Sequence, residues 1–206
     1  MDPKFLFVLI PVLVLPWVVL YFVLIAANKR VIANYKKLSE KYELTTDLSK
    51  KVGMKTHPFA EGIYRSRQVK IESVVRDSVD GNKIVPHTVL SVDCANQDNF
   101  HFKVVKRNKK NTQNYSTGST LIDDSEFDDK YIITTNNPAK VKKMFDFNTK
   151  FKLDQVSALG FNGIILLEGN KLVYMEPELL ANNDALMRLE LVMHELCDIA
   201  EVMRYN

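Results

Sequence analysis

The chain has 206 residues, of which 46% are hydrophobic and 26% are charged, with a formal charge of +3 from 28 basic and 25 acidic side chains. This composition allows a buried core and excludes a disordered or collagen-like chain, and the small net charge gives no reason to expect nucleic-acid binding. Cys94 and Cys197 lie far apart without a C-x-x-C spacing, so neither a disulfide framework nor a thiolate metal knuckle is expected.

The N-terminal segment has no charged residue between Phe5 and Ala27. As a helix, this run would extend about 34 Å at about 1.5 Å per residue, enough to cross a hydrocarbon core of about 30 Å once. Trp17 and Tyr21 are its aromatic residues with polar groups, and Tyr21 lies near the end of the run, where an interfacial ring is often found. We therefore expect residues 1–28 to form a single transmembrane anchor, with the lipid bilayer as its first partner.

Basic residues lie mainly on one side of this run. Lys29, Arg30, Lys36 and Lys37 follow it, whereas Lys4 alone precedes it. By the positive-inside rule, the sequence predicts a single-pass protein of the inner (plasma) membrane with its N-terminus outside and its C-terminal domain in the cytoplasm.

Two other interpretations of the apolar run stay open. A secretory signal cleaved after Ala27 would have an unusually long apolar region, and a buried core helix would normally have a polar face, which the run lacks. Within a transmembrane helix, Pro11 and Pro16 each remove a backbone donor and are expected to kink its first half.

Residues 29–50 are expected to form a juxtamembrane helix that continues from the anchor and ends near Leu44. Val31, Tyr35, Leu38 and Tyr42 recur at helical spacing and form an apolar stripe, so this stripe docks on the domain, on the membrane surface or on a second copy of the chain. Tyr35 is therefore a candidate for a partner surface.

Residues 51–206 are expected to form one cytoplasmic α+β domain, an antiparallel sheet with helices packed on one face. Residues 62–74 alternate between apolar and polar, as a half-buried strand does. A turn at 80–82 and strands at 89–92 and 100–105 follow, which together predict an antiparallel meander.

The second half of the domain alternates between strands and helices. Proline or glycine marks several boundaries, and Gly169-Asn170 is a hairpin turn signal. The predicted elements are a strand at 131–135, a helix at 138–145, a helix at 153–159, a hairpin at 164–175 and a helix at 183–203.

The last helix, started by Asn183 or Asp184, has one broad apolar face that should cover the sheet. Leu191 and Val202 lie on its far side. An oligomer or a partner subunit would cover them, so both are candidate partner-surface residues.

Reactive motifs are missing from the sequence. His194-Glu195-Leu196-Cys197-Asp198 resembles a zinc helix, but Asp198 replaces the second histidine, so we expect no metal site and interpret Glu190 and His194 as surface residues. Gly160 and Gly163 are explained as a helix end and a turn, and no phosphate cradle or nucleophile elbow occurs. We expect no catalytic residue and no cofactor.

Two charged segments are expected to lie on the solvated surface of the domain. Residues 103–111 are basic and residues 123–129 are acidic, and the simplest interpretation is a strand end and a loop whose charges partly compensate each other. The alternative is a module that senses anionic lipid through Lys36, Lys37 and the basic run at 106–110.

The run Phe127-Asp128-Asp129-Lys130-Tyr131-Ile132-Ile133-Thr134-Thr135-Asn136-Asn137-Pro138, followed by helices and the Gly169 hairpin, resembles uncharacterised bacterial membrane-anchored proteins of the DUF3137 type. The resemblance covers about 80 residues and departs at Asn-Asn-Pro, where an acidic turn is common. It implies a bacterial membrane protein and carries over no functional residues. We therefore expect a non-enzymatic scaffold, assembly or accessory subunit that binds another protein or a second copy of itself, with an unrecognised membrane-bound enzyme as the alternative.

Overall fold

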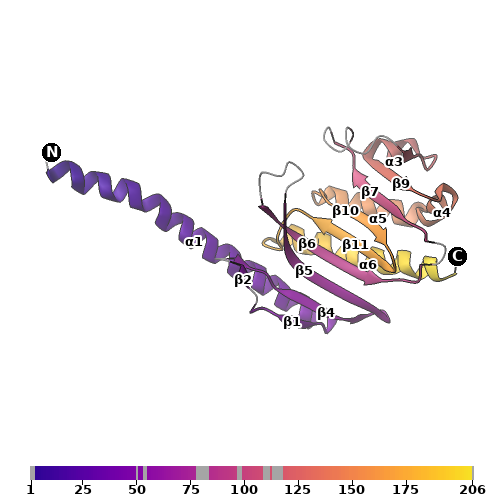
Figure 1. Ribbon diagram of the computed structural model, residues 1–206, viewed down its shortest axis with the longest axis horizontal. Helices are drawn as coiled ribbons and strands as arrows, with labels where there is room; N and C mark the ends of the chain where they lie inside the picture. Colours follow the sequence, from indigo (N-terminus) through magenta and orange to yellow (C-terminus); the bar gives the residue numbers. More distant parts are fainter. Residues whose placement is uncertain are drawn as a thin grey trace.

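The computed structural model describes residues 3–49, 51–52, 55–77, 84–96, 99–108, 112 and 118–205, and side-chain surroundings from residue 13 onward. It has an α+β fold in which a long apolar helix precedes a nine-stranded antiparallel sheet with helices. The N-terminal half of the long helix projects away from the rest of the molecule (Figure 1).

Helix α1 (Pro3–Tyr42) is continuous from the apolar run into the predicted juxtamembrane segment. It runs without a break through Pro11 and Pro16 and ends close to the predicted boundary near Leu44. The residues after it change structure at once, because Glu43 has a left-handed φ of 55° and strand β1 begins at Thr45. The apolar run and the domain are therefore joined by one helix without a linker.

The main sheet has the strand order β1-β4-β5-β6-β11-β10-β7-β9-β8, and all of its pairings are antiparallel. A separate two-stranded sheet, β2–β3, contacts α1. The strands are β1 (Thr45–Asp47), β2 (Lys51–Val52), β3 (Lys55–Thr56), β4 (Phe59–Tyr64), β5 (Arg67–Asp77), β6 (Ile84–Asp93), β7 (Phe102–Lys106), β8 (Ser119–Thr120), β9 (Tyr131–Thr135), β10 (Ile164–Glu168) and β11 (Lys171–Glu176).

The predicted meander is correct for the pairing of β5 with β6 and wrong beyond it. The β10–β11 hairpin, far along the chain, inserts between β6 and β7, so that Tyr174 pairs with Leu90 and Ile165 pairs with Val104. This hairpin was predicted at 164–175, and its turn is made by Gly169 with a φ of 55°. Local sequence patterns do not predict this pairing, because the order of strands along the chain does not determine their order in the sheet.

The single strand predicted at 62–74 is in fact a hairpin. Arg65 and Ser66 both have left-handed φ angles, 49° and 60°, which is the backbone of a two-residue type I′ turn. The usual Asn-Gly turn signal is absent here. The alternation of apolar and polar residues therefore predicted one uninterrupted strand. The turn predicted at 80–82 lies outside the described residues.

In the part of the chain that the structure describes, five helices accompany the sheet. Helix α5 starts six residues earlier than predicted because Asp146 caps it, accepting a hydrogen bond from the Thr149 backbone. The last helix is capped by Asn182 rather than Asn183 or Asp184, through a 2.7 Å bond from the Ala185 backbone. The described helices are α1, α3 (Ser125–Lys130), α4 (Pro138–Met144), α5 (Phe147–Ala158) and α6 (Asn183–Tyr205).

The core lies between one face of the sheet and the helices, with α5 and α6 behind the strands in the view of Figure 1. Alternate strand residues such as Ile71, Leu90 and Tyr174 are fully buried on this face. The predicted apolar face of the last helix is confirmed, because its members are buried. They are Leu186, Leu189, Val192, Met193, Leu196, Ile199, Ala200 and Met203.

Candidate functional site

The C-terminal part of α1 belongs to the core of the domain. Of its apolar stripe, Val31, Tyr35 and Leu38 are no more than 1% exposed, and Asn34 Nδ2 donates a 2.8 Å hydrogen bond to the Leu180 carbonyl. Of the three surfaces that the sequence left open for this stripe, the structure selects docking on the domain. Tyr35 is therefore not part of an exposed partner surface, because its ring fills the core and its hydroxyl lies 3.5 Å from Ser73 Oγ.

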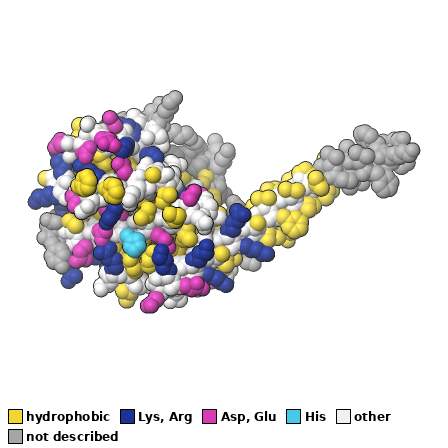
Figure 2. Space-filling model, turned by 180° about the vertical axis from the view of Figure 1, so that it is seen from behind, with side chains coloured by type: hydrophobic (Ala, Val, Ile, Leu, Met, Phe, Trp, Pro, Cys, Tyr) yellow, Lys and Arg dark blue, Asp and Glu magenta, His cyan; other side chains and the backbone are white. Residues whose placement is uncertain are grey.

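The side chains in the preceding part of α1 are mostly exposed. Trp17 is 73% exposed and Tyr21 is 50% exposed, while Ala27 is half-buried where the helix reaches the domain; the side chain of Phe5 lies outside the described residues. Figure 2 shows an almost continuous hydrophobic surface along this part of the helix. Within the described residues, one helix, α1, is long and apolar enough to cross a membrane.

Basic side chains occupy the side of α1 that faces solvent. Lys29, Arg30, Lys36 and Lys37 are all exposed, on the side of the helix opposite the buried stripe. In Figure 2, dark blue side chains follow the hydrophobic part of α1 at the point where it meets the domain.

His194 lies at a junction of three elements. Its Nδ1 is 2.9 Å from the hydroxyl of Tyr64 on β4, and its Nε2 is 3.3 Å from the hydroxyl of Tyr42 at the end of α1. The three rings pack edge to face at centroid distances of 5.1–5.9 Å. Burial lowers the pKa of His194, assisted by the cations Arg65 and Lys41. Both ring nitrogens are therefore engaged in a structural contact that joins α1 to α6.

A charged network surrounds this junction. Lys152 on α5 pairs with Asp198 and lies 3.1 Å from the buried carboxylate of Glu195, while Arg65 also pairs with Asp198. Burial raises the pKa of Glu195 and would raise that of Asp198 too, but the two cations outweigh burial at Asp198 and lower its pKa. Within the described part of the chain, no group of three or more His, Cys, Asp or Glu side chains could hold a metal ion.

The thiols are not placed for nucleophilic chemistry. Cys94 and Cys197 are free and buried, and burial raises the pKa of each to about 11. Cys197 is 1% exposed and belongs to the core, although Glu190 and His194 on the same helix are at the surface of the domain. A thiol with such a pKa is almost fully protonated near neutral pH.

An exposed aromatic pair on α5 is the most conspicuous apolar feature of the domain surface. Phe147 is 81% exposed and Phe151 is 55% exposed, and their rings stack with centroids 6.3 Å apart and planes 11° apart. Sequence reasoning missed both because it started this helix at residue 153. The signal was present, since Asp146 is a good N-cap residue and the two phenylalanines are four positions apart.

Helix α6 lies antiparallel beside α5. The Lys152–Asp198 ion pair joins the two helices at one point, and Arg188 donates to the Leu159 carbonyl at the other end of α5. On the outward side of α6, Met187 is 51% exposed. Two further outward residues, Leu191 and Val202, were predicted as partner-surface residues; Leu191 is partly buried against the core, and Val202 is 39% exposed.

We use the name α5–α6 surface for the outward apolar side chains of these two helices. Charges around it are already paired: Lys150 lies 2.9 Å from Asp124, and Lys152 is held by Asp198 and Glu195. The surface consists of Phe147, Phe151, Met187, Leu191 and Val202.

Comparisons with known proteins show the fold and no family. No protein-family model matches this chain, and no curated protein matches it. Among solved structures, the crystal structure of the mycobacterial trehalose monomycolate transport factor A, TtfA, is similar with a TM-score of 0.53 and 12% sequence identity. The likeness covers 86% of this chain and 94% of that one.

Proposed function

We propose that this chain is a single-pass membrane protein whose α+β domain acts as a non-enzymatic assembly or accessory subunit and binds another protein through the α5–α6 surface. The observation that carries the proposal is the stacked, exposed pair Phe147 and Phe151. Exposed aromatic side chains surrounded by polar groups are the usual anchors of protein interfaces, where burying one of them contributes about 2 kcal/mol or more.

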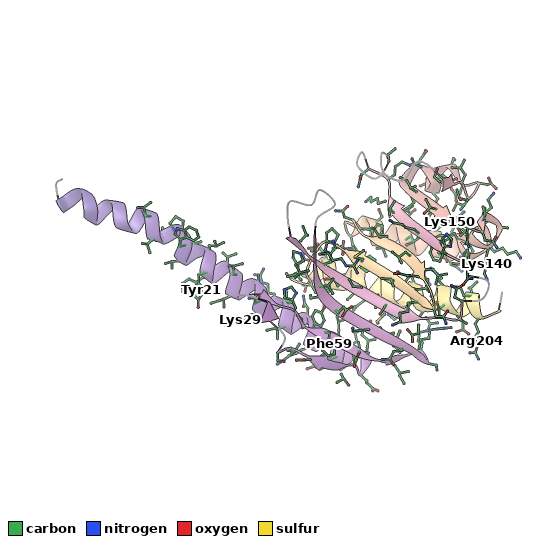
Figure 3. All side chains as sticks on the ribbon, viewed as in Figure 1. Tyr21, Lys29, Phe59, Lys140, Lys150 and Arg204 are labelled. Carbon is green, nitrogen blue, oxygen red and sulfur yellow. The ribbon has the colours of Figure 1, made fainter. Side chains whose placement is uncertain are left out.

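A protein partner fits this surface better than a lipid headgroup does. The lysines beside the phenylalanines are neutralised by Asp124, Glu195 and Asp198, so little positive charge remains to attract an acidic lipid. The part of the surface formed by Phe147 and Phe151 also lies far from the bilayer, because Lys150, next to them on α5, is at the opposite end of the molecule from Tyr21 and Lys29 (Figure 3).

The size of the surface favours a partner in the same membrane over a soluble one. Five side chains, some of them half-buried, expose a smaller area than the about 800 Å² that each partner buries in a typical stable interface. Anchoring both proteins in one bilayer raises their effective concentration and allows a small interface to suffice. The continuous helix α1 supports this arrangement, since it presents the domain in a fixed orientation.

Two further considerations support an accessory role. The similar structure of TtfA is named as a transport factor, and a comparable role in transport or assembly is therefore a reasonable expectation for a chain with this fold. An enzyme centred on His194 has less support, because Tyr42 and Tyr64 engage both of its ring nitrogens.

The partner proposal is tested by co-purification from crosslinked membranes with the F147S/F151S double variant. Ile63 on β4 is 71% exposed and provides a matched control, I63S. We expect a membrane protein to co-purify with the native chain and with I63S, and to be lost with F147S/F151S. Retention of the same protein by F147S/F151S would exclude this surface.

The orientation is proposed from the basic residues that follow the apolar run. We place the N-terminus outside the inner membrane and the domain in the cytoplasm, as Lys29, Arg30, Lys36 and Lys37 favour. Alkaline phosphatase fused to the C-terminus in a bacterial host should be inactive. An active fusion would reverse the orientation.

A further inference from the structure

The exposed cations of α1 form one continuous face, which we call the basic face. Lys29 and Lys36 lie seven residues, about two helical turns, apart, and Arg30 and Lys37 lie beside them, while Glu40 follows one turn after Lys36. The opposite face contains the buried residues Val31, Tyr35 and Leu38. Because that side is fixed in the core, the helix cannot rotate, and the cations point away from the domain. The basic face consists of Lys29, Arg30, Lys36 and Lys37.

These four cations differ from the other basic residues at the helix junction. Lys41, one turn further along, pairs with Glu190 at 2.9 Å, and Arg65 pairs with Asp198. Within the described part of the chain, by contrast, no carboxylate pairs with any member of the basic face. Their positive charge is therefore available to an external anion.

The helix sets the height of the basic face above the bilayer. At about 1.5 Å per residue, Lys29 lies about 3 Å beyond Ala27 along the helix axis, and Lys37 lies about 15 Å beyond it. A headgroup layer of roughly 5–8 Å follows the hydrocarbon core, and charges interact across a Debye length of about 8 Å at physiological ionic strength. Lys29 and Arg30 thus reach the headgroups, and Lys36 and Lys37 lie within screening distance of them.

We propose that the basic face binds the acidic headgroups of phospholipids in the leaflet where α1 leaves the bilayer. Lysine and arginine close to such a surface are attracted to it by charge. Because the domain is packed rigidly on the same helix, this contact fixes the tilt and rotation of the whole domain over the membrane. Phe147 and Phe151, which carry the proposed partner contact, are on α5 with Lys150 at the other end of the domain (Figure 3), so lipid binding and partner binding are separate properties.

The test uses the full-length protein in phosphatidylcholine vesicles with a trace of spin-labelled lipid. The association of spin-labelled phosphatidylglycerol with the protein is compared with that of spin-labelled phosphatidylcholine. We expect a severalfold preference for phosphatidylglycerol at low salt, and a ratio close to one for the quadruple variant K29Q/R30Q/K36Q/K37Q. Purified protein makes the result independent of its orientation in the cell.

A second variant controls for the loss of four charges. Arg76, Lys143, Lys171 and Arg204 are exposed cations outside α1, and R76Q/K143Q/K171Q/R204Q should retain the native preference. Native protein should also lose most of the preference in about 1 M NaCl, because exposed charges are screened. A native ratio close to one, a preference unchanged in K29Q/R30Q/K36Q/K37Q, or a preference insensitive to salt would overturn the proposal.

Discussion

The hydroxyl of Tyr64 lies 2.9 Å from Nδ1 of His194, and this contact joins strand β4 to the last helix. Tyr42 reaches the other ring nitrogen from the end of the anchor helix, at 3.3 Å. Helix α1 is thus fastened to the domain by a three-ring contact as well as by its apolar stripe. The contact contains a histidine whose pKa is lowered by burial, which gives it a measurable signature.

His194 should make stability depend on pH. Burial lowers its pKa in the folded state below the ordinary value of about 6.5, so the unfolded chain binds the proton more readily. The stabilising contribution of the neutral ring is complete above about pH 6.5 and is lost as the pH falls from there toward the lowered pKa. The difference in free energy of unfolding between the native chain and H194N should therefore be larger at pH 8 than at pH 5.

The comparison with H194N isolates His194 from other groups whose pKa is shifted. Glu195, whose pKa is raised by burial, makes the opposite contribution, because the folded state then binds the proton more readily. Both chains retain Glu195, so its effect cancels. Denaturant unfolding in detergent, followed by circular dichroism, measures the difference; an equal difference at both pH values would contradict the assignment.

Substitutions at Tyr35 should lower the free energy of unfolding as substitutions at core positions do. Its side chain is fully buried, so Y35A should lower the free energy of unfolding by about 3–5 kcal/mol, as large-to-small aromatic substitutions do. Y35F removes only a long 3.5 Å hydrogen bond and should cost about 1 kcal/mol or less. The exposed neighbour provides a control, since K36A should change stability by no more than about 0.5 kcal/mol. Equal effects of Y35A and K36A would mean that the stripe is not docked.

The β4–β5 turn offers a stabilising substitution. Ser66 has a φ of 60°, which costs a non-glycine residue about 1–2 kcal/mol, whereas glycine costs about 0.5–1 kcal/mol in additional chain entropy. S66G should therefore raise the free energy of unfolding by up to about 1 kcal/mol. The β-branched variant S66V should lower it, and urea titrations of both variants provide the measurement. A stabilised S66V would show that this position is not left-handed.

Much of the secondary structure could be predicted because it depends on residues that are close together in the sequence. The apolar run, the stripe at Val31 and the Gly169 hairpin each record a helical or strand period in consecutive residues, and all three were confirmed as secondary structure. The apolar face of the last helix was confirmed for the same reason. Pro138 likewise marked the start of α4 correctly.

The errors arose where the deciding interaction is not local. Insertion of β10 and β11 between β6 and β7 depends on pairings between residues 59–63 positions apart for β7–β10 and 78–88 positions apart for β6–β11. The stripe containing Tyr35 could be assigned to the domain only once its partners were known. The turn at Arg65 and Ser66 lacks glycine. Phe147 and Phe151 were missed because an N-cap at Asp146 was overlooked, although the sequence contained it.

The most direct test of the central claim is site-specific photocrosslinking in native membranes. A photoreactive amino acid at position 151, in place of Phe151, samples the α5–α6 surface, and the same group at the exposed position 63 on β4 samples a surface without a proposed partner. We predict a discrete adduct with one membrane protein from position 151 and none from position 63. No adduct from position 151, or the same adduct from both positions, would contradict the assignment of this surface as the binding site of an accessory subunit.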